Sequence, residues 1–319
     1  MKKITLIVFS TLSLIFGPIF ALIARTGYGA DICMRYGFLP LPVHYYSPVP
    51  DIPTLQKNNY WLEQKRSDMA GIEFNIENQL KLIQTLGKKF GQECVWPEKQ
   101  GSGKFHYYFE NPRFGYTSAC FLHAMIRLHK PKRVIEIGSG FSTLIISEAL
   151  EQNYNESGSD SEFIAIEPYP DSFLTEDIPG LNYLIEKKVE YLPLSTFDSL
   201  GENDILFIDS SHVIRIGGEV NYLYLDVLPR LNPGVITHIH DIQLPYDYPQ
   251  VYFTGRKKFL WTEQYLLQAF LINNRSFNIL LAAYFIQKDY SSAIENVFPN
   301  FDLNRHRPSS SFYMKRVNQ

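Results

Sequence analysis

Two stretches of the chain place aspartate and histidine directly after short apolar runs. The first reads DILFIDSSH and ends at His212, and the second reads GVITHIHD and ends at Asp241. Carboxylate oxygens and imidazole nitrogens bind Mg²⁺ or Mn²⁺, so Asp209, His240 and Asp241 could hold such a cation if the two runs lie side by side. His212 could serve as a general base near pH 7. Structural roles stay open for both histidines, and Asp241 could cap the next segment.

A third stretch, VIEIGSGFST, combines two glycines with an acidic residue. Gly138 and Gly140 let the backbone turn sharply and approach a ligand closely. A dinucleotide-binding loop would need a third glycine where this chain has Thr143, which disfavours a nicotinamide cofactor. Glu136, two places before the first glycine, suits a cationic ligand with an ammonium and a sulfonium group better than it suits a pyrophosphate.

A second acidic residue, Glu167, directly follows the apolar run at 163–166. A carboxylate in this position can accept two hydrogen bonds from ribose hydroxyls. The alternative is a turn glycine accompanied by two surface carboxylates. On the binding interpretation, the residues expected around the ligand are Glu136, Gly138, Ser139, Gly140, Ser142, Thr143, Glu167 and Asp209.

Strands must position these residues, because each group follows a short β-rich run. Strands are expected at 133–137, 163–166, within 183–192, and at 204–208, 234–239, 278–286 and 311–317. Helices are expected at 61–69, 72–86, 116–129, 142–151, 220–231 and 261–273. This alternation predicts a Rossmann-like α/β fold with a mostly parallel, seven-stranded sheet and helices on both faces. The carboxyl ends of parallel strands share one edge, where the acids and histidines would meet.

The N-terminus carries a segment that could cross a membrane. Two lysines precede an apolar run at residues 4–24, which is long enough for a spanning helix. A cleaved signal peptide is the rival interpretation, but Leu22 stands where a small residue should precede a cut after Ala24. We therefore expect residues 1–28 to form a membrane anchor.

An arm is expected between this anchor and the sheet. Residues 29–115 would form an extended and helical cap, since five prolines within residues 39–53 argue against regular structure there. This proline-rich part also contains Tyr45 and Tyr46. The remaining residues, 116–319, form the expected catalytic domain.

Composition excludes some partners. The net charge of −3 gives no basic excess, so we expect no nucleic-acid partner. Cys33, Cys94 and Cys120 are too few and too far apart for a disulfide framework or a zinc site, and we expect reduced, buried thiols.

The stretch EIGSGFST resembles the glycine loop of class I S-adenosylmethionine-dependent methyltransferases, and more specifically that of the methyltransferase 24 group. Residues 204–212, 228–248 and 261–271 carry the same likeness, which covers roughly residues 114–286. The resemblance implies an S-adenosylmethionine cofactor, held by the glycine loop and Glu167. It also implies an in-line transfer of the methyl group from sulfur to an oxygen.

Metal-dependent catechol and macrolide-sugar O-methyltransferases share the arrangement at the strand ends. In them an acid ends the fourth strand, a base follows three residues later, and a pair of metal ligands ends the fifth. Asp209, His212, His240 and Asp241 fall on these positions. His240 is a departure, since those enzymes more often have a carboxylate there, and a metal-free reaction that uses His212 alone stays open. The resemblance implies a small-molecule or glycan acceptor, with a sugar or glycan-linked hydroxyl favoured.

The orientation of the anchor conflicts with this activity. Basic residues ahead of the span favour a cytoplasmic N-terminus, which would place the catalytic domain away from its cofactor. Gly17 and Pro18 would break or kink a helix in mid-run. A dip into the inner leaflet, or a pull by Arg25 and Arg35, would keep the domain on the cytoplasmic side, where we expect it.

Two other functions remain alternatives. A nicotinamide oxidoreductase is disfavoured by Thr143, and a membrane-tethered scaffold without chemistry is disfavoured by the intact set of acids and glycines. The aromatic stretch at residues 244–249, together with Tyr45 and Tyr46, could form the acceptor wall. A plain packing role for these aromatics is the alternative.

Overall fold

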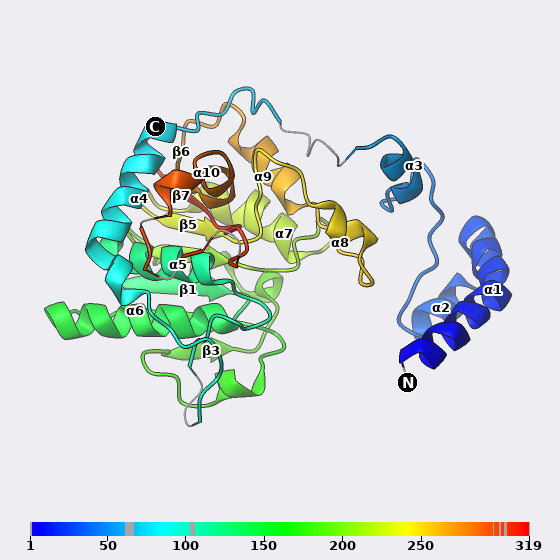
Figure 1. Cartoon of the computed structure of the whole chain (residues 1–319), viewed down its shortest axis with the longest axis horizontal. Coiled ribbons are helices and arrows are strands. Elements are labelled where there is room, and N and C mark those ends of the chain that lie inside the picture. The colour runs from blue at the N-terminus through cyan, green and yellow to red at the C-terminus, as the bar shows by residue number, and fades with distance from the viewer. Residues whose placement is uncertain are drawn as a thin grey trace. The chain divides into compact units, whose positions relative to one another are not determined.

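The computed structural model describes residues 2–60, 67–102, 106–295, 297–299, 301–302 and 305–318. The chain divides into two compact units. One is Met1–Gln64 with Pro249–Leu260, and the other is Lys65–Tyr248 with Trp261–Gln319. The second unit contains a seven-stranded sheet in the order β3-β2-β1-β4-β5-β7-β6 (Figure 1). Its strands are β1 (Arg133–Ile137), β2 (Glu162–Ile166), β3 (Tyr183–Ile185), β4 (Ile205–Ile208), β5 (Ile236–Ile239), β6 (Phe277–Ala282) and β7 (Phe312–Arg316).

The order of the strands alone predicts where a ligand binds. Strands β1 to β5 run parallel, whereas β7 is antiparallel to both of its neighbours. From β1 the chain moves outward through β2 to β3, and from β4 it moves the opposite way to β5. Because crossovers are right-handed, the helices that follow β1 and β4 cover opposite faces of the sheet. The order reverses between β1 and β4, and ligands bind beyond the carboxyl ends of strands at such a point.

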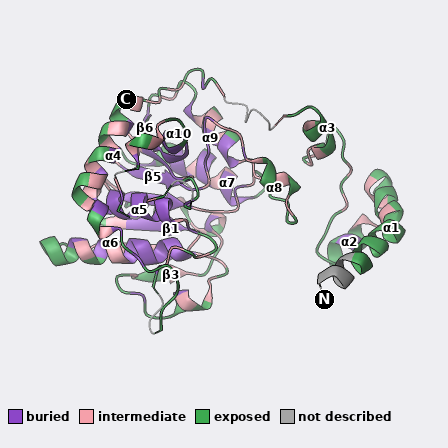
Figure 2. Ribbon diagram, viewed as in Figure 1, coloured by how far each residue is buried: buried purple, intermediate pink, exposed green. Residues whose placement is uncertain are grey.

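The helices of the described residues are α1 (Lys2–Thr26), α2 (Ala30–Arg35), α3 (Ile52–Lys57), α4 (Ile76–Phe90), α5 (Tyr116–His129), α6 (Phe141–Ser157), α7 (Glu219–Tyr222), α8 (Gln250–Thr254), α9 (Glu263–Leu271) and α10 (Ala283–Asp289). Helices α1, α2, α3 and α8 belong to the first unit, and the other helices of the described residues belong to the unit that contains the sheet. A π-helical turn, Leu223–Val227, continues α7. The strands β4 and β5 and the middle of α5 are buried throughout, so the core lies around the sheet centre (Figure 2).

Some expected elements have different bounds. The polar residues 152–157, expected as a loop, are the last turns of α6, which ends where Gly158 adopts a left-handed conformation. The expected strand at 278–286 stops at Ala282 and continues as α10, because a short apolar run does not distinguish strand from helix. The helix expected at 72–86 begins later, at Ile76. Of the helix expected at 61–69, residues 61–66 lie outside the described part, and residues 67–69 are not helical.

The first unit contains the apolar N-terminal segment. Within α1, residues Ile7–Thr26 are long and apolar enough to cross a membrane, and none of them is buried (Figure 2). A signal sequence near the N-terminus can meet the same criteria of length and composition. Of the break or kink expected at Gly17 and Pro18, the break is wrong, because α1 continues through both. Pro18 has no backbone N–H, so one helical hydrogen bond is missing, and the intact turns on either side keep the helix continuous.

The expectation of buried thiols is confirmed. Cys33, Cys94 and Cys120 are all free and buried.

Candidate active site

The glycine turn connects the ends of three strands through backbone hydrogen bonds and close packing. Gly138 follows β1 and has a φ of +84°, a conformation that favours glycine. A Cβ at this position would lie 1.7 Å from the backbone oxygen of Asp209, the residue that follows β4. The backbone N–H of Gly138 donates to Ile166 on β2 at 3.0 Å, and that of Asp209 donates to Ile137 on β1 at 2.8 Å. The turn therefore brings the ends of β1, β2 and β4 into direct contact.

Glu136 lies beneath this turn and is completely buried. Ser142 Oγ donates to Glu136 Oε1 at 2.6 Å, and Thr143 Oγ1 donates to Glu136 Oε2 at 2.7 Å. Thr143 Oγ1 also accepts the backbone N–H of Gly140 at 3.0 Å. Burial raises the pKa of Glu136 to about 8, against the two hydroxyl hydrogen bonds that lower it. Both carboxylate oxygens are thus used to fix the start of α6.

A cleft opens above the turn. A cavity of about 300 Å³ and a smaller one of about 170 Å³ are both lined by Gly138, Glu167 and Asp209. Ser139 lines the smaller cavity, and Ser210 and Ser211 line the larger one. The hydroxyl oxygens of Ser139 and Ser210 are buried without a hydrogen-bond partner among the described residues.

These serine hydroxyls could therefore bond to a ligand in the cleft. Of the three acids expected to share a cavity, Glu167 and Asp209 line it, whereas Glu136 does not. The expectation that Glu136 contacts the ligand directly thus finds no support, because its oxygens face Ser142 and Thr143.

Glu167 lines both cavities. Its Oε1 accepts the backbone N–H of Tyr169 at 2.8 Å. Burial raises the pKa of Glu167, against backbone hydrogen bonds from Tyr169 and Ser139 that lower it. The larger cavity continues past Lys188 and Glu190, which follow β3, and sequence reasoning gave these two residues no role.

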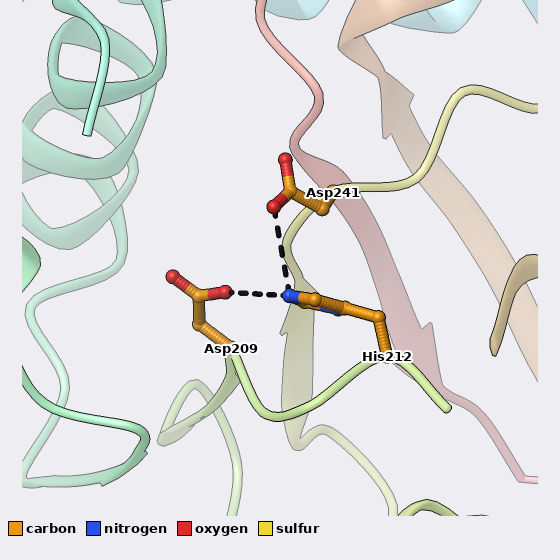
Figure 3. Close-up of side chains that lie close together, drawn as sticks. All are labelled: Asp209, His212 and Asp241. Atoms are coloured by element: carbon orange, nitrogen blue, oxygen red, sulfur yellow. Dashed lines mark ion pairs between the residues drawn. The ribbon is translucent and has the colours of Figure 1, made fainter. Parts of the chain in front are cut away.

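Asp209, His212 and Asp241 come together where β4 and β5 end (Figure 3). His212 Nε2 lies 3.2 Å from Asp209 Oδ1 and 3.5 Å from Asp241 Oδ2. His212 and Asp241 both have left-handed backbones, with φ of 59° and 58°. Non-glycine residues in this conformation are uncommon and are often found at functional sites. His212 after β4 and Asp241 after β5 both adopt this conformation, and their side chains contact each other.

Glu263 is a member of this group that sequence reasoning missed. Its Oε2 lies 2.7 Å from His212 Nδ1, and its side chain is fully buried. The backbone N–H groups of Thr262 and Glu263 both donate to the oxygen of His212, at 2.8 and 3.1 Å. Acidic residues are common in the first turn of a helix because the helix dipole favours them there. The position of Glu263 in the sequence therefore did not indicate a role in the site.

The three carboxylates determine the charge of His212. Burial lowers the pKa of His212, but hydrogen bonds with Asp209 and Glu263 and the charge of Asp241 outweigh burial and raise it well above its usual value. Burial raises the pKa of Asp209, but the charge of His240 and the hydrogen bond with His212 outweigh it and lower that pKa. Without a cation among them, these carboxylates favour the protonated imidazole, so His212 Nε2 must lose its proton before it can ligate a cation.

The residues fit a divalent cation, but not in the expected combination. Ligand atoms of Asp209, His212 and Asp241 lie within 4.8 Å of one another, and two oxygens with one nitrogen suit Mg²⁺ or Mn²⁺. His240, expected as the third ligand, lies outside this group of described residues. Its ring packs 4.8 Å from that of Phe114, and its Nε2 lies 3.8 Å from Asp241 Oδ1, beside the group.

Comparison with known proteins agrees with this geometry. The profile of the methyltransferase 24 family, described as a methyltransferase domain, matches residues 135–242, which include the glycine turn and both strand ends. A protein of Archaeoglobus fulgidus, described as uncharacterized, is 34% identical over 184 residues, which are 56% of this chain and 80% of that protein. The chain belongs to the methyltransferase 24 family. It is a class I S-adenosylmethionine-dependent methyltransferase with the Rossmann-like fold of that class.

Two solved methyltransferase structures show more distant likeness. A 16S rRNA (adenine(1408)-N(1))-methyltransferase from Catenulisporales acidiphilia is 10% identical with a TM-score of 0.30, covering 61% of this chain and 91% of that one. A putative protein-L-isoaspartate O-methyltransferase from Plasmodium falciparum, in complex with S-adenosyl-L-homocysteine, is 12% identical with a TM-score of 0.28, covering 59% and 81%. Scores this low carry no weight for the acceptor of this methyltransferase.

The aromatic stretch after β5 packs within the methyltransferase. Leu244 and Tyr248 are buried, and the Tyr248 ring lies 6.0 Å from that of Trp261. Trp261 in turn places its ring 4.5 Å from that of His212. For Leu244 and Tyr248 the packing alternative therefore holds, and Trp261 is the aromatic residue beside the polar group. Tyr45 is exposed and belongs to the other unit.

Proposed function

We propose that this methyltransferase transfers a methyl group from S-adenosylmethionine to a hydroxyl of a sugar or of a glycan-linked acceptor. One observation carries the proposal: Asp209 lines both cavities of the cleft and also belongs to the polar group with His212. Methyl donor and acceptor hydroxyl would thus meet at one residue. The face of Trp261 beside that group suits a sugar ring.

The cleft residues divide the cofactor between its two cavities. The adenosine part would occupy the larger cavity, with its ribose hydroxyls on Glu167, and the methionine part would occupy the smaller one. The backbone of Gly138, Ser139 and Gly140 would face the methionine part. The negative charges of Glu167 and Asp209 favour the sulfonium cation. Glu136 would act from below, by holding Ser142 and Thr143 in place, instead of by direct contact.

The chemical step needs alignment and the removal of a proton. The bond between sulfur and the methyl carbon breaks as the bond from that carbon to the acceptor oxygen forms, in line. The hydroxyl proton passes to the ion pair of Asp209 and His212, in which the carboxylate of Asp209 can accept it while His212 stays protonated. We assign Asp209 and His212 as the catalytic residues. A divalent cation held by Asp209, His212 and Asp241 would polarise the acceptor oxygen when bound.

Tethering to a membrane completes the proposal. The segment Ile7–Thr26 would anchor the chain, and the catalytic domain would lie on the cytoplasmic side, where the cofactor is made available. A lipid-linked glycan is an acceptor that such an anchor would bring close. Protease treatment of sealed, right-side-out vesicles tests the orientation. A C-terminal tag that is cut from outside would place the domain on the non-cytoplasmic side and would reject the proposed orientation.

Transfer of a labelled methyl group by the full-length chain in detergent tests the activity. The acceptors would be panels of glycans, lipids and catechols. Asp209→Asn and His212→Ala should lower kcat by about 10²–10⁴-fold, the usual contribution of proton-transfer groups. The exposed Asp226→Asn provides a matched control that should keep full activity. Unchanged turnover in the first two variants would remove them from the mechanism, and methylation of catechols alone would reject the glycan acceptor.

A further inference from the structure

The smaller cavity offers a positive charge next to the glycine turn. We propose that Arg113 binds the carboxylate of the cofactor's methionine part and that Asp171 occupies Arg113 while the cofactor is absent. This inference rests on the proposed function, because it assumes that the methionine part enters this cavity.

The charges around the cavity require such a residue. The methionine part carries an ammonium, a sulfonium and a carboxylate group. Glu167 and Asp209 suit the two cations but repel the carboxylate. Among the described residues that line the smaller cavity, Arg113 is the cationic one. The larger cavity has two cations, Lys188 and Arg215, and Arg215 Nη2 is held at 2.8 Å by Glu219 Oε2, whose side chain is only 10% exposed.

The backbone around Arg113 is fixed by a side chain. The N–H groups of Arg113 and Phe114 donate to Asn111 Oδ1 at 3.0 and 2.7 Å, and Asn111 Nδ2 donates back to the Phe114 oxygen at 2.8 Å. Phe114 itself is buried, so the turn is held against the core. The side chain of Arg113 nevertheless remains 61% exposed. Arg113 therefore starts from a fixed place and keeps a guanidinium that can change partners.

Asp171 demonstrates the kind of group that this guanidinium accepts. Nη1 and Nη2 of Arg113 donate to the two carboxylate oxygens of Asp171, the second at 3.4 Å. Arginine binds carboxylates in this forked manner. Because the two side chains are 61% and 37% exposed, their pairing is of the weak surface kind. A cofactor carboxylate that is held at several other points can replace it.

The test compares two ligands that differ only in the carboxylate. Binding of S-adenosylmethionine and of decarboxylated S-adenosylmethionine to the full-length chain in detergent would be measured by calorimetry, for the wild type, Arg113→Met, Arg113→Lys and Asp171→Asn. Arg113→Met should weaken S-adenosylmethionine binding by about tenfold, in line with loss of a charged hydrogen bond. It should change binding of the decarboxylated form by less than twofold. Arg113→Lys should restore part of the loss, and Asp171→Asn should tighten S-adenosylmethionine binding alone.

Each outcome decides the inference. Equal effects of Arg113→Met on the two ligands would overturn it, as would equal wild-type affinities for both. Arg215→Met serves as the matched control, since a cation in the larger cavity should treat the two ligands alike. Thermal unfolding of each variant separates misfolding from lost binding, and Arg113→Lys supplies a second folded variant. A wild type that binds neither ligand would refute the proposed function itself, and this inference with it.

Discussion

Neutralising Glu136 should stabilise the protein in a manner that depends on pH. Glu136 is fully buried beneath the glycine turn, and burial raises its pKa from 4.5 to about 8. In the unfolded chain the same carboxyl loses its proton near pH 4.5. Between these two values the folded protein therefore binds more protons than the unfolded chain, and its stability falls as the pH rises. Glu136→Gln removes this effect, because the amide does not titrate.

The size of the effect follows from the two pKa values. A difference of one in pKa is worth about 1.4 kcal/mol, so the destabilisation from Glu136 reaches about 3 kcal/mol at pH 7 and about 4 kcal/mol at pH 8. The amide keeps one acceptor for the hydroxyls of Ser142 and Thr143, and the altered hydrogen bond costs about 1 kcal/mol. The net gain of about 2 kcal/mol at pH 7 corresponds to a Tm that is higher by about 4–8 °C.

Thermal unfolding between pH 4.5 and pH 8 measures this gain. The full-length chain in detergent would be compared with Glu136→Gln and with Glu186→Gln, which removes an exposed carboxylate. The advantage of Glu136→Gln should be absent near pH 4.5 and should grow up to pH 8, whereas Glu186→Gln should follow the wild type. Parallel Tm curves for the wild type and Glu136→Gln would show that Glu136 is ionised in the folded protein and would refute the reasoning.

Three further predictions test the site. Gly138→Ala should lower the free energy of unfolding by about 3 kcal/mol or more, since its Cβ would lie 1.7 Å from a backbone oxygen. Gly158→Ala, whose Cβ would have nothing within 4 Å, should lower it by about 1 kcal/mol. Chemical denaturation of the two variants measures the difference. Glu263→Gln should lower kcat by about 10–100-fold at an unchanged KM for S-adenosylmethionine, because it removes the charged partner of His212 Nδ1, and steady-state kinetics would show it. Binding of the cofactor cation should release a fraction of a proton from Glu136 at pH 7, which calorimetry in buffers of different ionisation enthalpy detects; heats that do not depend on the buffer would contradict this.

The sequence was sufficient for the sheet and for the location of the cleft. Short apolar runs separated by helical patterns predicted all seven strands of the structure, and acidic residues after those runs marked their carboxyl ends. This worked because strand ends in a parallel sheet have a fixed relation to each other. Element ends were predicted less well. The polar end of α6 was expected as a loop, yet residues 154–157 face solvent on the last helical turns, and Asn153 is buried and hydrogen-bonded to Arg127.

Side-chain directions within the site could not be predicted in the same way. Whether Glu136 faces the cleft or the helix depends on where the hydroxyls of Ser142 and Thr143 fall, which follows from the geometry of the turn. The choice between His212 and His240 depends on the left-handed backbone of His212, which no local pattern indicates for a residue other than glycine. Glu263 is far from His212 in the sequence, and only tertiary packing brings them together.

The position of Asp209 explains how the proposed step could proceed without a change in the net charge of the site. Before transfer, the positive charge resides on the sulfonium in the cleft. After transfer, the sulfur is neutral and a proton has reached the ion pair of Asp209 and His212. Asp209 lines the cleft and also pairs with His212 at 3.2 Å, so it lies beside the charge at both stages. A carboxylate that keeps a partner throughout needs little reorganisation, which is the condition under which a fixed charge assists a reaction most.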